Sequence, residues 1–160
     1  MTSSSNPTTF TMPSDREIVI TRVFDAPRRL VFEALTKPEH VRRWWGLKSL
    51  TMVICEMDFR PGGTWRFVLR GPDGTNYGFR GAYREIVPPE RVVSTFEFEG
   101  MPGHVSLETL TLDEQNGTTK LTSTCLYQSA EDRDGHFNSG MEAGTRESYE
   151  LLDELLRTIE

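Results

Sequence analysis

Segments in which apolar and polar residues alternate fill the middle of the chain, and turn residues separate them. Alternation with period two, interrupted by Gly, Pro and Asn, is typical of β-strands joined by tight turns. The pattern predicts an antiparallel meander of about six or seven strands. The turns fall at Pro61-Gly62-Gly63, Gly71-Pro72-Asp73-Gly74, Pro88-Pro89, Gly100-Met101-Pro102-Gly103 and Asn116-Gly117. The strands are expected over residues 17–24, 50–59, 64–70, 75–87, 91–98, 104–112 and 118–127.

The two sides of the predicted strands differ in character. In the segment 64–70, the aromatic residues Trp65 and Phe67 share one side, and Arg66 lies on the other. Such alternation implies that one side of the sheet faces a core and the other faces solvent. We expect the outward arginines to be solvated, and a stripe that binds a partner is the alternative.

Two short helices are expected between the first and second strands. Pro27 precedes apolar residues that recur at helical spacing over residues 30–35, and proline is tolerated in the first turn of a helix. Pro38 should end this helix and begin a second one. Trp44 and Trp45 would lie on the inner face of the second helix.

The C-terminal segment predicts one long amphipathic helix, from about residue 131 or 136 to residue 159. Its second half carries apolar residues that fill space, whereas Gly140, Gly144 and Ser148 recur at spacing four in its first half. Glycine inside a helix costs about 1 kcal/mol relative to alanine. Two explanations remain open: close packing of the helix against the sheet, or room left for a ligand. The expected solvent face carries Glu147, Glu150, Asp153 and Glu154.

A helix that lies across a curved sheet encloses space, and many aromatic residues are placed to project into it. Aromatic walls with few polar groups are typical of small-molecule pockets. The alternative is that these rings simply fill a core. On the first interpretation, the residues that contact a ligand are Trp44, Trp45, Trp65, Phe67, Tyr77, Phe79, Phe96, Met141, Gly144, Thr145 and Ser148.

The chain has 160 residues, which suits one domain, and a formal net charge of -6. Residues 1–15 are rich in Ser, Thr and Pro, so we expect a flexible tail followed by a single domain over residues 16–160. The acidic balance argues against binding to nucleic acid, which usually needs a basic surface. No apolar run approaches the roughly 20 residues of a membrane helix, and the pattern of a signal peptide is missing. We therefore expect a cytoplasmic protein.

No metal-binding or cofactor-binding motif is apparent in the sequence. Cys55 and Cys125 are far apart, and we expect buried free thiols rather than a disulfide. His40, His104 and His136 do not pair at metal-ligand spacing, so we expect neither a metal nor a cofactor. We expect His136 to be a surface residue, and a general-base role for His104 is an alternative.

A few polar groups are candidates for the interior of the cavity. A carboxylate in an apolar pocket would have a raised pKa and could act as an acid or a base. Glu142 and Arg146 lie at positions i and i+4, so an ordinary surface pair is the simpler expectation for both. The full set of candidates is Tyr77, Glu97, Thr124, Glu142 and Arg146.

Several short motifs occur in an order and at a spacing that resemble one protein family. They are Val23-Phe24-Asp25-Ala26-Pro27-Arg28-Arg29-Leu30-Val31-Phe32, Trp44-Trp45-Gly46, Phe59-Arg60-Pro61-Gly62-Gly63-Thr64-Trp65, and Gly140-Met141 with Gly144. Residues 16–158 resemble the heat-shock-protein ATPase activator homologue-like proteins of the START-related (SRPBCC) superfamily. The resemblance implies an α+β helix-grip fold, in which a curved antiparallel sheet wraps around a long C-terminal helix. It also implies a deep cavity for an apolar ligand, such as a lipid, a steroid or a polyketide.

The sequence departs from the pattern of that family at two positions. Leu47 follows Trp44-Trp45-Gly46, where relatives often carry proline, and Thr145 follows Gly144, where many relatives carry tryptophan. The second change removes a large ring near the expected mouth of the cavity. It should enlarge the pocket or alter its selectivity.

Three functions from different classes follow from this interpretation. The leading hypothesis is a protein that binds a small apolar or amphipathic molecule between the sheet and the C-terminal helix. The second is an enzyme that performs acid–base chemistry on a polyketide-like or aromatic substrate, with roles for Tyr77, His104 and Glu142. The third, implied only by the family, is an interaction module that regulates a chaperone ATPase. An edge strand or the outer face of the sheet would be available for a homodimer.

Overall fold

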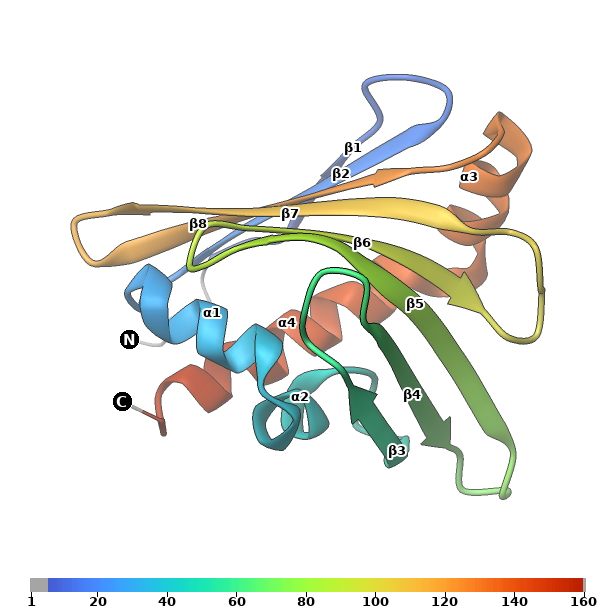
Figure 1. Ribbon diagram of the computed structural model, residues 1–160, viewed down its shortest axis with the longest axis horizontal. Helices are drawn as coiled ribbons and strands as arrows, with labels where there is room; N and C mark the ends of the chain where they lie inside the picture. The colour runs from blue at the N-terminus through green and yellow to red at the C-terminus, as the bar shows by residue number, and fades with distance from the viewer. Residues whose placement is uncertain (1–5, 160) are drawn as a thin grey trace.

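The computed structural model describes residues 6–159, which form one eight-stranded antiparallel sheet and several helices (Figure 1). The strand order is β1-β2-β8-β7-β6-β5-β4-β3, so the chain runs as a meander from β3 to β8 and then returns beside β2. The strands are β1 (Thr9–Thr11), β2 (Glu17–Phe24), β3 (Thr51–Met57), β4 (Thr64–Arg70), β5 (Asn76–Val87), β6 (Arg91–Phe98), β7 (Ser106–Gln115) and β8 (Thr118–Leu126). The helical segments are α1 (Arg28–Thr36), α2 (Pro38–Trp44), α3 (Ala130–His136), the π-helical turn η2 (Phe137–Met141) and α4 (Glu142–Leu156). The predicted α+β helix-grip architecture is confirmed.

The segment expected to be a flexible tail contains the additional strand β1. This strand pairs with β2 in antiparallel register, with Thr9 opposite Thr21. Thr8 is buried, and its carbonyl oxygen accepts a hydrogen bond from Arg146 at 2.5 Å. The expectation of a tail is therefore wrong for residues 9–11, because backbone pairing with a sheet edge needs no apolar side chains. Residues 1–5 of the expected tail lie outside the described part of the chain.

The sheet is strongly curved, and α4 lies along its concave side (Figure 1). Register shifts occur between Met52 and Ile54 in β3 and between Tyr83 and Glu85 in β5. Irregularities of this kind bend a strand and increase its twist. They therefore help to turn the β3–β5 half of the sheet around the helix.

The core contains both apolar side chains and one buried ion pair. Ile18 and Phe24 of β2 and Leu152 of α4 are fully buried. Arg22 lies on the same side of β2 as these apolar residues, and it pairs with Asp153 of α4. The prediction that Asp153 lies on the solvent face of the helix is wrong, because Arg22 provides a charged partner inside the protein.

The predicted single C-terminal helix is interrupted. It consists of α3, η2 and α4, and the break falls at Gly140, whose φ is 94°. No atom lies within 4 Å of a Cβ built on Gly140, so this glycine supplies a backbone conformation rather than close packing. A Cβ built on Gly144 would meet only a methyl group of Leu47, at 3.6 Å. Within residues 6–159, no helix is both long and apolar enough to cross a membrane.

Candidate functional site

A pocket of about 390 Å³ lies between the concave side of the sheet and the helices. Its walls come from β2 and β3–β8, from α1 and α2, and from the segment α3-η2-α4. Pockets of roughly 300–1,000 Å³ with mostly apolar walls are typical of small-molecule sites. The concavity that α4 leaves under the curved sheet is therefore large enough to hold such a molecule.

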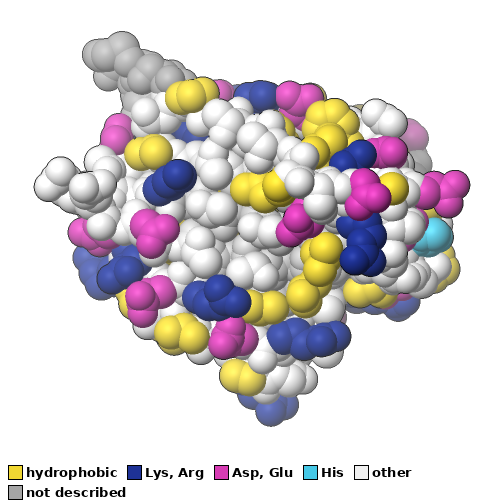
Figure 2. All heavy atoms as spheres, turned by 90° about the horizontal axis from the view of Figure 1, so that it is seen from above, with side chains coloured by type: hydrophobic (Ala, Val, Ile, Leu, Met, Phe, Trp, Pro, Cys, Tyr) yellow, Lys and Arg dark blue, Asp and Glu magenta, His cyan; other side chains and the backbone are white. Residues whose placement is uncertain are grey.

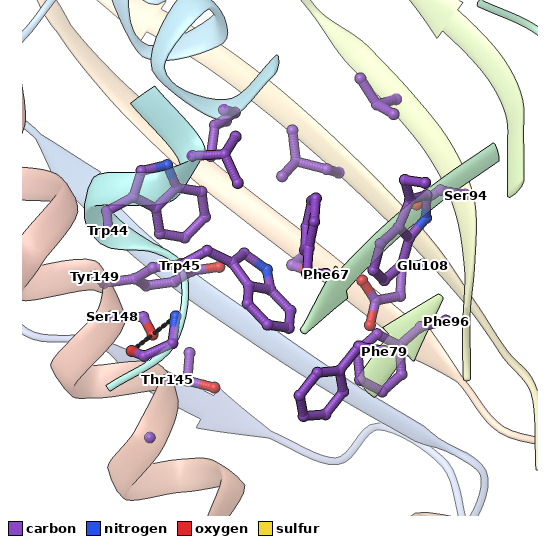
Figure 3. A pocket seen from close by; sticks show the side chains of 18 of the residues that line it. Trp44, Trp45, Phe67, Phe79, Ser94, Phe96, Glu108, Thr145, Ser148 and Tyr149 are labelled. Atoms are coloured by element: carbon purple, nitrogen blue, oxygen red, sulfur yellow. Dashed lines mark hydrogen bonds between the residues drawn. The ribbon is translucent and has the colours of Figure 1, made fainter. Parts of the chain in front are cut away.

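Aromatic rings form one wall of the pocket (Figure 3). The ring of Trp45 lies at its centre, with ring centroids 5.0 Å from Phe67, 5.1 Å from Phe79 and 6.4 Å from Trp65. Phe96 continues this wall, 5.8 Å from Phe79 and 6.1 Å from Trp65. We call these five residues the aromatic wall. The rings meet at tilted or edge-to-face angles, so several ring faces and edges are presented to the same space.

Three hydrogen bonds near the end of α2 fix the pair of tryptophans. The indole N–H of Trp44 donates to the carbonyl oxygen of Ala34 at 2.8 Å, which joins α2 to α1. The chain then leaves the helix at Trp45 and turns at Gly46, whose φ is 109°. The hydroxyl of Ser148 accepts a hydrogen bond from the amide of Gly46 and donates one to its carbonyl oxygen. The turn that follows Trp45 is therefore hydrogen-bonded to α4.

The structure brings together ten of the eleven residues that the sequence suggested for ligand contact. Tyr77 is the exception: it lies outside the pocket, and 38% of its surface is exposed. It shares a side of the sheet with Phe79, but it lies at the hairpin end of β5, opposite Leu69. Alternation predicts the side of the sheet to which a side chain points. It does not predict how far along the strand the helices cover that side. The ten residues around the pocket are Trp44, Trp45, Trp65, Phe67, Phe79, Phe96, Met141, Gly144, Thr145 and Ser148.

The polar candidates from the sequence lie elsewhere. Glu97 faces the outer side of the sheet, where it accepts hydrogen bonds from Arg80 at 3.2 Å and from the amide of Gly103 at 2.7 Å. Thr124 lies outside the pocket as well. Glu142 and Arg146 form the expected surface pair, 2.9 Å apart. None of these residues lines the pocket.

His104 is also outside the pocket. Its Nδ1 atom lies 2.8 Å from a carboxylate oxygen of Asp132, and half of its side chain is exposed. Together with Tyr77 and Glu142, it was proposed to act in an enzyme reaction. The structure contradicts those three assignments, because none of these side chains reaches the enclosed space.

Glu108 is a pocket residue that the sequence analysis missed. It lies opposite Ser94 of β6 and opposite Cys125 of β8, and all three residues line the pocket. Burial raises the pKa of the Glu108 carboxyl to about 7. The sequence did contain a signal for this placement. Glu108 is spaced by two residues from Leu110 and by four from Leu112, so the three side chains share one side of the strand.

His136 is the second missed residue, and the prediction that it is a surface residue is wrong. Its ring stacks on Phe96 with 5.8 Å between centroids, and its Nδ1 atom lies 2.6 Å from the hydroxyl of Tyr127. Burial lowers the pKa of His136, so the imidazole is neutral near pH 7. It reaches the pocket because α3 ends at this residue, where the chain turns into η2.

The other titratable groups of the pocket wall are uncharged near neutral pH. Burial raises the pKa values of the Cys125 thiol and of the Tyr83 and Tyr149 hydroxyls. No lysine or arginine occurs among the described residues that line the pocket. Across residues 6–159, no group of three or more His, Cys, Asp or Glu side chains is arranged to hold a metal ion. Glu108 is therefore the lining group that changes charge near pH 7.

Comparison with solved structures shows the same fold in several bacterial proteins. A crystal structure from Rhodobacter sphaeroides is 27% identical in sequence, with a TM-score of 0.90, and the match covers 96% of this chain and all of that one. A crystal structure from Mycobacterium smegmatis is 25% identical, with a TM-score of 0.85 and coverage of 96% and 99% of the two chains. A solution structure from Arthrobacter aurescens is also 25% identical, with a TM-score of 0.84 and coverage of 93% and 91%.

The family assignment rests on a match along most of the chain. A search of curated proteins found no match. The family model described as "Activator of Hsp90 ATPase homolog 1-like protein" matches residues 25–157, which include every described helix and all strands from β3 to β8. The chain therefore belongs to the activator of Hsp90 ATPase homolog 1-like family.

Proposed function

We propose that the protein binds a small apolar or amphipathic molecule in the pocket between the sheet and α4. The observation that carries this proposal is the cavity of about 390 Å³ beside the aromatic wall. A core that is simply filled with aromatic rings would leave no such space, because protein interiors pack densely. The aromatic wall supplies the apolar contact area. Thr145 has a small side chain, so it leaves the pocket beside it open.

Polar groups beside the aromatic wall would orient the bound molecule. Ser94, Glu108 and Ser123 come from three adjacent strands, β6, β7 and β8, and all face the pocket. A few convergent polar groups in an otherwise apolar site fix the orientation of a ligand and give it specificity. The arrangement therefore favours a molecule with an apolar body and one polar end over a pure hydrocarbon.

Native mass spectrometry of the freshly purified protein tests the proposal, followed by extraction of any bound compound under denaturing conditions. We expect an additional mass that denaturation removes, or one that appears after incubation with apolar compounds. The variant Phe79→Ala should lose it, whereas Tyr77→Ala should keep it, because Tyr77 lies outside the pocket. A protein that stays free of ligand in a broad screen, or equal retention by the two variants, would contradict the proposal.

Acid–base catalysis on the bound molecule is a second candidate. Glu108 and His136 face one pocket, and the pKa of Glu108 of about 7 suits proton transfer near neutral pH. If the extracted compound is converted by the protein, Glu108→Gln should abolish turnover even when the compound is supplied at a concentration that fills the pocket. Unchanged turnover in that variant would exclude Glu108 from the chemistry. Regulation of a chaperone ATPase has only the family description in its favour.

A further inference from the structure

We infer that the ligand carries a positively charged amine, which lies between the aromatic wall and the carboxyl group of Glu108. This inference rests on the proposed function, because it concerns the polar end of the molecule in the same pocket.

The pocket offers no positive charge of its own among the described residues that line it. Its described lining residues include no lysine or arginine, and His136 is neutral because burial disfavours its charged form. A ligand carboxylate or phosphate would therefore meet Glu108 without any cation to offset the repulsion. Among the described lining residues, an ammonium group would meet one carboxyl group, that of Glu108, and no competing cation.

Among the described residues, Glu108 has no arginine partner of the kind that the glutamates on the outer side of the sheet have. On the outer side of the sheet, Glu99 accepts two hydrogen bonds from Arg66 at 2.7 and 3.0 Å, and Glu97 accepts one from Arg80. The carboxyl group of Glu108 instead accepts from the thiol of Cys125, at 3.9 Å, and a thiol is a weak donor. A carboxylate in an apolar pocket is costly unless it is paired, so a cationic ligand would supply what the protein does not.

The aromatic wall also favours a positively charged group. Cations are attracted to the faces of aromatic rings, most strongly to tryptophan, and proteins use such rings to recognise ammonium groups. Figure 3 shows the carboxyl group of Glu108 directed towards the rings of Phe79 and Phe96. An amine placed there would contact the carboxyl and the rings together, while its apolar body extends along Trp45 and Trp65.

Three probes with the same aromatic body test the inference: naphthylethylamine, naphthylethanol and naphthylacetic acid. Their binding is measured by calorimetry near neutral pH, with the unmodified protein, with Glu108→Gln and with the outer-face control Glu97→Gln. We expect the amine to bind most tightly and the acid most weakly. The change Glu108→Gln should weaken amine binding about tenfold or more, because hydrogen bonds to charged groups are the stronger ones. It should change alcohol binding less than about twofold, and Glu97→Gln should change neither.

The outcomes separate this inference from the proposed function. If the alcohol binds as tightly as the amine, or if Glu108→Gln leaves amine binding unchanged, the inference is overturned and the proposed function stands. If the acid binds best, the inference is overturned in the same way. If none of the probes binds, the inference fails, and native mass spectrometry decides separately whether another molecule occupies the pocket. The three-probe order in the unmodified protein remains decisive even if Glu108→Gln does not fold.

Discussion

The guanidinium group of Arg22 in β2 lies 3.3 Å from the carboxylate of Asp153 in α4, and both side chains are almost completely buried. The two residues are 131 positions apart in the chain. Their pairing joins β2, which lies beside the last strand of the meander, to α4, which the sheet encloses. Arg22 also lies over the ring of Phe24, and Asp153 also accepts a hydrogen bond from Arg157.

The change Asp153→Ala should destabilise the protein by about 3–5 kcal/mol, because it leaves the buried guanidinium of Arg22 without its carboxylate. Denaturant unfolding measures this loss. Arg157→Ala is the matched control, since Arg157 contacts the same carboxylate from a half-exposed position. It should cost about 1 kcal/mol or less, as is usual for surface pairs. Equal losses in the two variants would contradict a special role for the buried pair.

The variant Glu108→Gln should be more stable than the unmodified protein at pH 8 and about equally stable at pH 4. The folded-state pKa of Glu108 is raised from 4.5 to about 7, so the folded protein keeps a proton that the unfolded chain has released between these values. The contribution of Glu108 to the free energy of unfolding therefore falls as pH rises from about 4.5 to 7, and it is constant above that range. The effect is at most about 3.5 kcal/mol, at roughly 1.4 kcal/mol per pKa unit between 4.5 and about 7.

Glu97→Gln is the control for this pH dependence. The amide of Gly103 and the guanidinium of Arg80 lower the pKa of Glu97, so its contribution to stability is lost as pH falls. Its Gln variant should therefore lose stability near neutral pH and not gain it. Denaturant unfolding of the three proteins at several pH values makes the comparison, and parallel pH profiles for Glu108→Gln and the unmodified protein would refute the assignment.

Gly140→Ala should destabilise the protein by about 1–2 kcal/mol, because the left-handed conformation at this position is unfavourable for a residue with a Cβ. Gly135→Ala should instead be neutral or stabilising by up to about 1 kcal/mol, because Gly135 lies in α3 with open space around it. Thermal unfolding of both variants tests the origin of the break in the C-terminal helix. A stabilising Gly140→Ala change would show that the break is not needed.

Thr145→Trp should reduce the amount of ligand bound, because the larger ring would occupy space beside Met141 and Gly144 in the pocket wall. Glu150→Trp is the control, since it adds the same ring to an exposed position of α4. Native mass spectrometry under identical loading measures the difference. Undiminished binding by Thr145→Trp would mean that the ligand occupies another part of the cavity.

Much of the candidate site was predictable from local patterns. Trp65, Phe67 and Phe79 could be assigned to the inner side of the sheet because side chains alternate along strands. Glu108 follows the same rule but was not assigned, because carboxylates are usually exposed and the rule does not say which one is enclosed. His136 could not be placed in this way, since its position depends on the break that Gly140 introduces into the helix.

By itself the sequence determined the approximate positions of β2–β8 and of the turns, the two short helices and the family, because alternation, turn chemistry and short motifs are local properties of the chain. It did not reveal β1, which depends on backbone pairing with β2. Only the tertiary structure decided which residues enclose the pocket. Long-range packing set how far α4 covers the sheet, which left Tyr77 outside and Glu108 and His136 inside. It also decided that Asp153 is buried, because a carboxylate at one end of the chain is stable in the core only where an arginine from the other end reaches it.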